Sequence, residues 1–374
     1  MIPYDRLFKK KTNTVIQAYC VDIDGAAKTI TLKHSSEDKK DSKEKKVLGY
    51  DYLILGIGSD YPIWQSASNS HVEFKKLLLS IRESFAASKS CTIVGGGAVG
   101  LEAAGELKHN MPHLDVTIVS SPEHLLANDK QLIPLMRRLC LEDAKKAGIK
   151  VILNTKVDNV KDIASRDDVE TIAQGWYKGK GGNPITLSLT NNADKKTEEH
   201  SANIVLITVG GTPNTAFLKN TKVPLDSHGC IEVTPTYQVR GFDSIFALGD
   251  SAASGEPRLA FVAKMQSEIV VKNIVASVNK SALKSGPVHL LPIGIVPIGP
   301  KFGWGQLPGI FRPNVIRAIA GFKSKDYMVS MIYPQLNYTM KDTQEANKPP
   351  SGVVIRNPTN SVVAVAAAEA EVAK

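Results

Sequence analysis

One short stretch of the chain reads as a strand, a glycine turn, a helix and a second strand, and it restricts the possible folds more than any other feature. It runs from Cys91 to Ser121 with the sequence CTIVGGGAVGLEAAGELKHNMPHLDVTIVSS. Gly95, Gly97 and Gly100 follow the first strand with G-x-G-x-x-G spacing. The first glycine permits a tight turn, the second lets the backbone approach a pyrophosphate, and the third lets the helix pack on the strand. The stretch predicts a dinucleotide-binding unit with the pyrophosphate at the helix N-terminus. The alternative is a tight turn that binds no ligand.

The sequence leaves the choice between NAD and NADP open. Counting about 20 residues from Gly95 reaches Asp115, where an acidic ribose ligand is expected. Asp115 precedes the strand of residues 116–119, however, so it lies at the wrong end of the sheet. Ser120 stands at the carboxyl end of that strand, with Ser121 next to it. A serine does not repel a 2′-phosphate as a carboxylate does, so both nucleotides remain candidates.

The rest of the chain alternates strands with helices, which is typical of a parallel α/β sheet. Two apolar runs end in glycines, as buried parallel strands do at a cofactor, and they are Tyr50–Ser59 and Ala202–Thr215. The other expected elements are two short strands within residues 14–32, helices over 71–89, 128–148 and 258–278, and a β-meander over 155–200. With 374 residues, the chain is long enough for two or three domains.

The formal net charge of +9 is compatible with an acidic partner such as a nucleotide, a nucleic acid or an anionic membrane. The segment Lys33–Lys46 mixes charges of both signs, which is typical of a solvated hairpin loop rather than a nucleic-acid surface. The sequence contains no zinc-finger, RNA-recognition or helix-turn-helix signature. We therefore do not expect nucleic-acid binding.

The cysteines are too far apart in sequence to form a CxxC pair, and they are Cys20, Cys91, Cys140 and Cys230. We expect buried free thiols rather than a zinc site or a local dithiol. The N-terminal MIPYDRLFKKKTN is basic without an apolar core, so it does not read as a signal peptide. No apolar run approaches the ~18 residues that span a bilayer. These features predict a cytoplasmic location, and a membrane-associated or mitochondrial one stays open.

Three further strand ends have a characteristic order along the chain, one before the glycine fingerprint and two after it. They are YDYLILGIGS (Tyr50–Ser59), VGGTPNT (Val209–Thr215) and SIFALGDSA (Ser244–Ala252). In this order they resemble the two-dinucleotide flavoproteins of the pyridine nucleotide–disulfide oxidoreductase type. The segments MIPYDRLF, TIVGGGAVGLEAAGEL and FGWGQLPG look most like the apoptosis-inducing-factor-like and ferroptosis-suppressor-like NAD(P)H:quinone reductases. The resemblance covers roughly residues 2–335.

The resemblance implies an α/β fold of two Rossmann-like, three-layer ββα dinucleotide-binding domains. The NAD(P)H domain is inserted into a split FAD domain, and a C-terminal α+β portion follows. The expected boundaries are 1–88 for the first FAD part, 89–215 for the NAD(P)H domain, 216–282 for the second FAD part, 283–340 for the C-terminal portion and 341–374 for a weakly ordered tail.

The resemblance also assigns roles to residues. For NAD(P)H it implies pyrophosphate contacts from the fingerprint residues Gly95, Gly97 and Gly100. It also implies a second turn that lines the site, formed by Gly210, Gly211 and Pro213. Ser120 is the implied contact at the strand end. Glu102 matches an acidic position near the nicotinamide and is a candidate for positioning it. For FAD the implied residues are Gly56, Gly58, Gly249 and Asp250, with Asp250 accepting hydrogen bonds from ribityl or ribose hydroxyls. The helix after Arg258 would direct its N-terminus toward the flavin.

The sequence departs from the family pattern in three places. Gly56-Ile57-Gly58 replaces a segment close to ATG, so a hydroxyl is lost, and Tyr333-Pro334 stands where a basic residue is frequent. Full family members also open with their own strand–GxGxxG–helix for the FAD pyrophosphate, whereas this sequence begins at MIPYDRLF. We therefore expect the FAD domain to be truncated at its N-terminus by at least one βαβ unit, which is ~30 residues.

Two functions follow from the resemblance. The first is an oxidoreductase in which NAD(P)H reduces FAD and the flavin passes electrons to a small quinone-like acceptor, with possible association at a membrane surface. The protein then supplies binding, orientation and electrostatics, while the cofactor supplies the redox chemistry. The alternative is a truncated, non-catalytic fragment that binds pyridine nucleotide weakly and holds little or no FAD. The sequence does not specify the oligomeric state.

Overall fold

The computed structural model describes residues 13–16, 18–34, 45–61, 71–286, 294–300, 303–307 and 314–317. These residues form two compact units. The first holds the described residues up to Asp60 and from Gly211 to 286, and the second holds those from Tyr61 to Gly210 and from 294 to 317. The segment MIPYDRLF, most of the charged Lys33–Lys46 segment, Tyr333-Pro334 and the tail 341–374 lie outside the described residues. The domain boundaries expected from the sequence stay a prediction.

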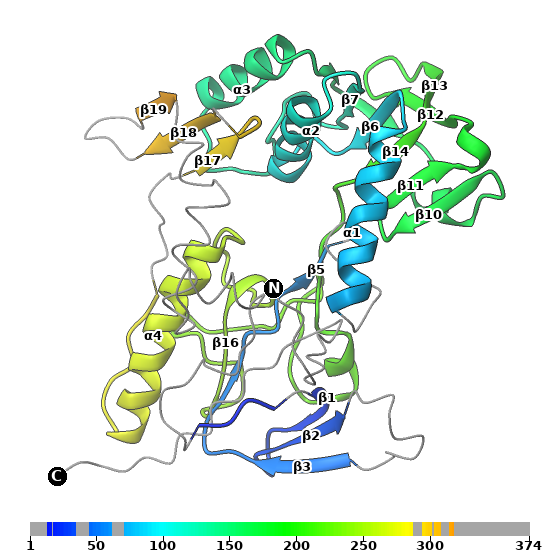
Figure 1. Cartoon of the computed structure of the whole chain (residues 1–374). Coiled ribbons are helices and arrows are strands. Elements are labelled where there is room, and N and C mark those ends of the chain that lie inside the picture. The colour runs from blue at the N-terminus through cyan, green and yellow to red at the C-terminus, as the bar shows by residue number, and fades with distance from the viewer. Residues whose placement is uncertain are drawn as a thin grey trace, which may run out of the picture. The chain divides into compact units, whose positions relative to one another are not determined.

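A six-stranded sheet with the order β10-β11-β14-β6-β7-β8 forms the centre of the second unit (Figure 1). The strands β14 (Ile204–Ile207), β6 (Ser90–Val94), β7 (Asp115–Val119) and β8 (Lys150–Ile152) are parallel to one another. The hairpin of β10 (Val169–Ala173) and β11 (Trp176–Gly179) adds antiparallel strands beside β14. The parallel α/β sheet predicted from the alternating pattern is therefore confirmed.

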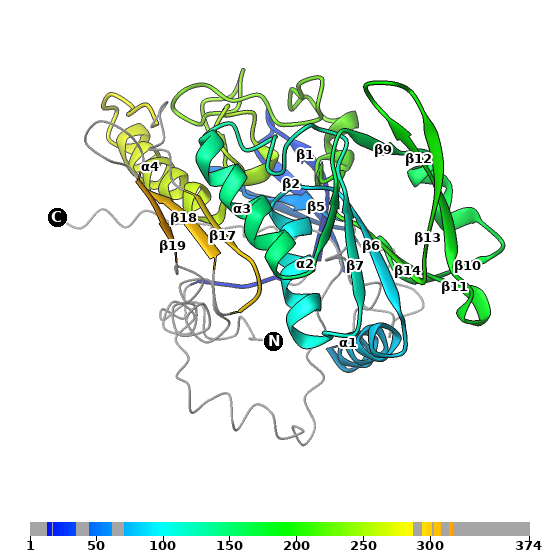
Figure 2. The ribbon, with the colours of Figure 1, turned by 90° about the horizontal axis from the view of Figure 1, so that it is seen from above.

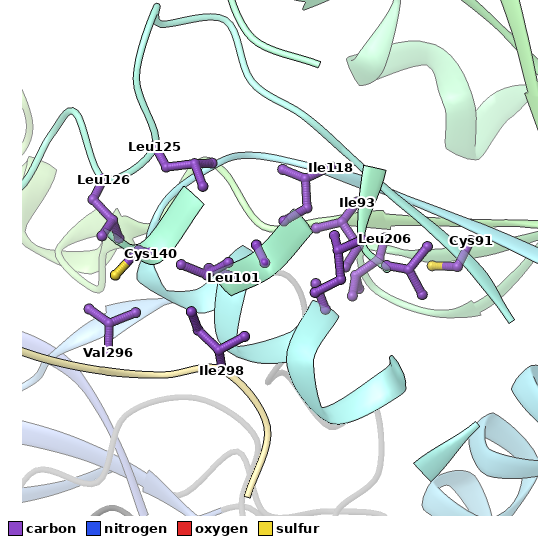
Figure 3. Close-up of a cluster of buried hydrophobic side chains, with 14 of the residues drawn as sticks. Cys91, Ile93, Leu101, Ile118, Leu125, Leu126, Cys140, Leu206, Val296 and Ile298 are labelled. Atoms are coloured by element: carbon purple, nitrogen blue, oxygen red, sulfur yellow. The ribbon is translucent and has the colours of Figure 1, made fainter. Parts of the chain in front are cut away.

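Helices cover one face of this sheet and bury an apolar core with it. The helices of this unit are α1 (His71–Ala86), α2 (Ala98–Asn110) and α3 (Pro134–Lys146). Alternate strand residues such as Ile93, Ile118 and Leu206 pack with Leu101 of α2 and Cys140 of α3 (Figure 3). All five side chains are at most 1% exposed, so this face of the sheet is closed to water.

The opposite face of the sheet packs on a second, antiparallel sheet with the order β13-β12-β9 (Figure 2). Its strands are β9 (Thr155–Val157), β12 (Ile185–Asn191) and β13 (Thr197–Ala202). Val205 and Ile207, which alternate with the helix-facing residues of β14, join Leu187 and Leu189 of β12 in this core. The second unit therefore has the three layers, two sheets and one layer of helices, that the resemblance implies.

Helix α3 begins later than the sequence pattern suggests. The pattern predicts a helix from Asn128, but residues 128–132 form turns and the helix starts at Pro134. A proline disfavours helical geometry in the preceding residue, and Ile133 is extended, with φ −73° and ψ 157°. The predicted stop at Gly148 is confirmed, because this glycine adopts φ +79° and the N–H groups of Gly148 and Ile149 bond back to the last turn.

A three-stranded antiparallel sheet is attached to the helical layer of the same unit. Its strands are β17 (Gly294–Pro297), β18 (Gly303–Leu307) and β19 (Asn314–Arg317). The indole N–H of Trp304 donates to Asp143 of α3 at 3.0 Å. The fully buried Gln306 accepts from the Ile133 N–H at 2.8 Å and donates to the Gln131 carbonyl at 2.8 Å. The GWGQ motif thus anchors this three-stranded sheet at the start and on the inner face of α3.

The first unit repeats the layered arrangement on a smaller scale. Its antiparallel sheet consists of β1 (Ala18–Asp24), β2 (Thr29–His34) and β3 (Lys45–Gly49), and its parallel pair consists of β4 (Leu53–Leu55) and β16 (Ile245–Ala247). The predicted early strand pair within residues 14–32 is therefore confirmed. Ile245 and Ala247 face the antiparallel sheet, whereas Phe246 packs with Val270 of α4 (Ala260–Val278).

Short elements complete both units. A two-stranded ladder joins β5 (Ser59–Asp60) to β15 (Thr212–Pro213) in the first unit. Short 3₁₀ segments occupy Val160–Ser165, Lys180–Gly182, Ala216–Asn220 and Gly249–Ser251. Among the helices that the structure describes, none combines the length and the apolar character needed to cross a bilayer.

The anchoring of the sheet of β17, β18 and β19 predicts a stability effect for Gln306→Leu. The substitution keeps a similar volume but leaves the Ile133 N–H and the Gln131 carbonyl without their partner. Each unpaired buried polar group costs about 1–3 kcal/mol, so the free energy of unfolding should fall by about 2–6 kcal/mol in a urea titration followed by circular dichroism.

The matched control is Arg138→Met, which removes an exposed pair with Glu142 on α3. Such surface pairs contribute about 0–1 kcal/mol, so this variant should unfold close to the parent. Equal stability of Gln306→Leu and the parent would contradict the anchoring role.

Candidate functional site

The glycine fingerprint forms a turn that only glycine can adopt at two of its positions. Gly95 has φ +127°, and a Cβ built on it would lie 2.6 Å from the hydroxyl oxygen of Thr208. A Cβ on Gly100 would collide with the carbonyl oxygen of Gly95. The first and third glycines therefore have the steric roles that the spacing predicts, a tight turn and close contact between strand and helix.

The N-terminus of α2 offers an open anion-binding position. Gly97 is the N-cap residue, and nothing lies within 4 Å of the position of a Cβ on it. No side chain caps this helix end and no acidic residue stands in its first turn. The free N–H groups and the helix dipole therefore favour an anion here, and the space beside Gly97 fits the pyrophosphate of a dinucleotide.

Thr208, at the end of β14, supports this turn and was not identified from the sequence. Its hydroxyl lies 3.0 Å from the Val94 carbonyl oxygen and 3.3 Å from the Gly95 carbonyl oxygen, and donates its proton toward these acceptors. The parallel pairing of β14 with β6 places Thr208 beside the end of β6. The only signal in the sequence is a hydroxyl residue at the end of an apolar strand. It indicates a role for Thr208 only when the strand that pairs with β14 is known.

The residues predicted at the ribose end occupy two different edges of the sheet. Asp115 begins β7, as expected, at the edge opposite the fingerprint. Ser120 follows β7 at the same edge as the fingerprint, is 2% exposed, and directs its hydroxyl toward Gly96. The exposed hydroxyl at this strand end belongs to Ser121. A contact of Ser120 with the nucleotide stays a prediction.

The structure gives the positions of Glu102 and of the second glycine turn, but it does not test their predicted roles. Glu102 lies half-buried in the second turn of α2. Gly210 follows β14 in the second unit with φ +90°. Gly211 and Pro213 belong to the first unit, where Pro213 pairs with Ser59. Their predicted contacts with NAD(P)H stay predictions.

In the first unit, the predicted flavin-binding turns meet at one edge of the parallel pair. The N–H of Leu248 donates to the carbonyl of Leu55 at 3.1 Å, directly beyond the paired ends of β4 and β16. Gly58 has φ +64° with nothing within 4 Å of its Cβ position, and Gly249 has φ +74°. The structure therefore brings Gly56–Gly58 and Gly249–Asp250 together, at the edge where cofactors bind in open α/β sheets.

Two buried hydroxyls beside these turns lack partners. Among the described residues, Ser59 Oγ and Ser251 Oγ are buried without a hydrogen-bond partner, and Ser251 as a whole is 0% exposed. Each follows directly after a predicted flavin-binding segment. A buried hydroxyl without a partner costs free energy. These two orphaned groups therefore fit a polar ligand such as the sugar-like chain of a flavin dinucleotide.

A buried polar network holds the Gly249 turn against α4. The Gly249 N–H donates to Gln266 Oε1 at 2.7 Å, and Gln266 Nε2 donates to Glu256 at 2.6 Å. The Tyr237 hydroxyl donates to the same carboxylate at 3.0 Å, and burial together with this carboxylate raises the pKa of Tyr237. The network fixes the peptide that precedes Asp250. Gln266 was missed because one polar residue in an apolar helix carries no sequence signal of its partner.

The four cysteines are buried free thiols, as predicted. Burial raises the pKa of the Cys20 thiol to about 11 and that of the Cys140 thiol to about 12. In the part of the chain that the structure describes, no three His, Cys, Asp or Glu side chains are arranged to hold a metal ion.

Comparison with known proteins identifies relatives of the whole arrangement. The model of the family described as "Pyridine nucleotide-disulphide oxidoreductase" matches residues 5–267. Ferroptosis suppressor protein 1 of Mus musculus is 26% identical over 333 residues, which cover 82% of this chain and 81% of the relative. FAD-dependent oxidoreductase FVFD30 of Flammulina velutipes is 25% identical over 325 residues, which cover 85% of this chain and 91% of the relative.

A solved structure shares the fold. NDH2 from Plasmodium falciparum, in complex with NADH, superposes with a TM-score of 0.60 at 15% sequence identity and covers 87% of this chain and 81% of its own. At this level of identity the likeness concerns the fold alone. It agrees with the two layered units seen here.

The contacts of Thr208 predict a binding effect for Thr208→Val. Valine has nearly the same shape but cannot donate to the Val94 and Gly95 carbonyls, so the turn loses its support. One hydrogen bond of about 1 kcal/mol corresponds to roughly five- to tenfold weaker NADH binding, measured by quenching of protein fluorescence.

Thr31→Val provides the control, because Thr31 lies in β2 of the first unit, an element that carries no residue predicted to bind NAD(P)H. It should bind NADH like the parent. Unchanged affinity in Thr208→Val, or equal loss in both variants, would show that Thr208 does not support the nucleotide turn.

Proposed function

Because the chain belongs to the pyridine nucleotide-disulphide oxidoreductase family, we propose that it is an FAD-dependent enzyme that oxidises NAD(P)H and passes the electrons to a quinone-like acceptor. The family supports an oxidoreductase with FAD and NAD(P)H as its cofactors. A quinone-like acceptor is supported by the resemblance of MIPYDRLF, the fingerprint and FGWGQLPG to quinone reductases. Association with a membrane surface belongs to the same proposal.

One observation carries this function. The residues after β4 and β16 combine two glycines in left-handed geometry with two orphaned buried hydroxyls at a single sheet edge. A fold that served pyridine nucleotide alone would gain nothing from leaving Ser59 and Ser251 unpaired. These groups would supply polar contacts to a second dinucleotide.

In the second unit, this chain's own residues would bind and orient the pyridine nucleotide. The N–H groups at the start of α2 would bind its pyrophosphate, with Gly97 leaving the space for it. Thr208 holds the Val94 and Gly95 carbonyls, so the turn keeps its N–H groups toward the anion. Glu102 is proposed to position the nicotinamide end. No side chain is required to exchange a proton with the nucleotide.

In the first unit, Asp250 is proposed to accept hydrogen bonds from the hydroxyls of the flavin side chain, with Gly56, Gly58 and Gly249 leaving space for its close approach. Gln266 holds the Gly249 peptide, and so fixes the direction of the turn that carries the carboxylate. FAD bound there would supply the redox chemistry, accepting a hydride equivalent and releasing electrons to the acceptor.

Two variants separate the roles of the two units. Gly100→Val places a side chain against the Gly95 carbonyl, so it should abolish NAD(P)H-dependent reduction of a soluble quinone while the purified protein keeps its flavin absorption. Asp250→Leu should instead lower the flavin content and leave NADH binding within about twofold of the parent, since Asp250 lies in the other unit.

Activity is measured as quinone-dependent NAD(P)H oxidation, and flavin content from the visible spectrum. Loss of flavin in Gly100→Val, with full flavin in Asp250→Leu, would contradict the assignment of the two sites. A parent protein that is colourless after reconstitution with FAD would favour the alternative, a non-catalytic fragment that binds pyridine nucleotide weakly.

A further inference from the structure

The loop after β7 is held in place by backbone bonds from three neighbouring segments. The Ser120 N–H donates to Ile152, and the Ser120 carbonyl accepts from Thr155. The Pro122 carbonyl accepts from Asn154 at 2.9 Å. The same loop lies next to the fingerprint, because the Gly95 N–H donates to Val119. A nucleotide with its pyrophosphate on α2 therefore places its adenosine ribose over this rigid loop.

Asn192 extends this loop from a distant part of the sequence. It lies in the turn between β12 and β13, and its Nδ2 donates to the Ser121 carbonyl at 2.7 Å and to Ser121 Oγ at 3.1 Å. Because Ser121 Oγ accepts this bond, its own proton is directed away from Asn192. Ser121 is exposed, so this proton is available to an acceptor in solution.

A positive charge stands beside the backbone carbonyl of Asn192. Lys195 Nζ donates to the Asn192 carbonyl at 2.7 Å, and Lys195 is held at the hairpin turn with φ +60°. The nearby Asp194 carboxylate already accepts from the Lys196 N–H at 3.0 Å. Glu123 is exposed and stands three residues beyond Ser120, outside the strand end itself. The loop after β7 thus presents a hydroxyl donor, and the turn that is hydrogen-bonded to it through Asn192 presents an ammonium group.

From this arrangement we propose that the Ser121–Asn192–Lys195 cluster is the specificity determinant for the coenzyme and accepts the 2′-phosphate of NADPH. The inference rests on the proposed pyridine-nucleotide site of the second unit. A phosphate offers only acceptors and negative charge, which match the Ser121 proton and the Lys195 ammonium. A ribose-selective site would carry a carboxylate at this strand end, which accepts from the two ribose hydroxyls and repels a phosphate.

Within the cluster the residues have different roles. Ser121 and Lys195 would contact the phosphate. Asn192 is a positioning residue, because it orients Ser121 and holds the lysine through its carbonyl. The hairpin that carries Asn192 is part of the antiparallel sheet, so the third layer of the unit contributes to nucleotide choice as well as to the core.

The experiment compares 2′,5′-ADP with 5′-AMP by isothermal titration calorimetry on the full chain. The two probes differ only in the 2′-phosphate and report on the site without flavin or turnover. The parent should bind 2′,5′-ADP at least as tightly as AMP. Ser121→Asp should weaken 2′,5′-ADP at least about tenfold, and Lys195→Met and Asn192→Leu about three- to tenfold, with AMP affinity changed by less than about twofold.

Glu123→Gln is the matched control, and it should leave the ratio of the two affinities unchanged. The proposal is overturned if the parent binds AMP more tightly than 2′,5′-ADP, if the three cluster variants weaken both probes equally, or if Glu123→Gln raises the relative affinity for 2′,5′-ADP about tenfold. In the last case, Glu123 rather than the cluster would select the coenzyme, by binding the ribose hydroxyls.

The rates at which the protein oxidises NADH and NADPH distinguish failure of this inference from failure of the proposed function. Oxidation of NADH with no detectable use of NADPH would contradict the inference and leave the function standing. Selective binding of 2′,5′-ADP with no oxidation of either nucleotide would contradict the function and support the cluster.

Discussion

Parallel strand pairing is the constraint on which both candidate sites depend. Parallel strands end at the same edge of a sheet, so the residues that follow them meet without any further interaction. The pairing of β6 with β14 and β7 brings the fingerprint beside Thr208 and Ser120. The pairing of β4 with β16 does the same for Gly58 and Gly249 in the other unit.

The polar groups at these two edges differ in which of them have hydrogen-bond partners. At the fingerprint, the carbonyls of Val94 and Gly95 have a partner in Thr208, and the N–H groups at the start of α2 remain open to an anion. In the first unit, Gln266 occupies the N–H of Gly249 while Ser59 and Ser251 keep unpaired hydroxyls. At both edges, hydrogen bonds therefore hold the backbone in place, while other polar groups remain available to a ligand. This combination is what a preorganised binding site requires.

Local patterns were sufficient to predict much of the fold. The fingerprint, the apolar strands, the glycine stop of α3 and the buried thiols follow from residue type and spacing alone. The start of α3 was wrong by one turn or more, because apolar spacing outweighed the effect of Pro134 on the residue before it. Thr208, Gln266 and Asn192 could not be identified, because each acts on a backbone or side chain that is distant in sequence and adjacent only after folding.

We propose that one chain carries a pyridine-nucleotide site and a flavin site that exchange electrons. An anaerobic titration of the flavin-loaded protein with NADPH, followed at the visible flavin bands, tests this claim directly. The bands should bleach in proportion to added NADPH, and bleaching should reach completion near one equivalent per flavin. Bands that persist at a large excess of both NADPH and NADH would contradict it.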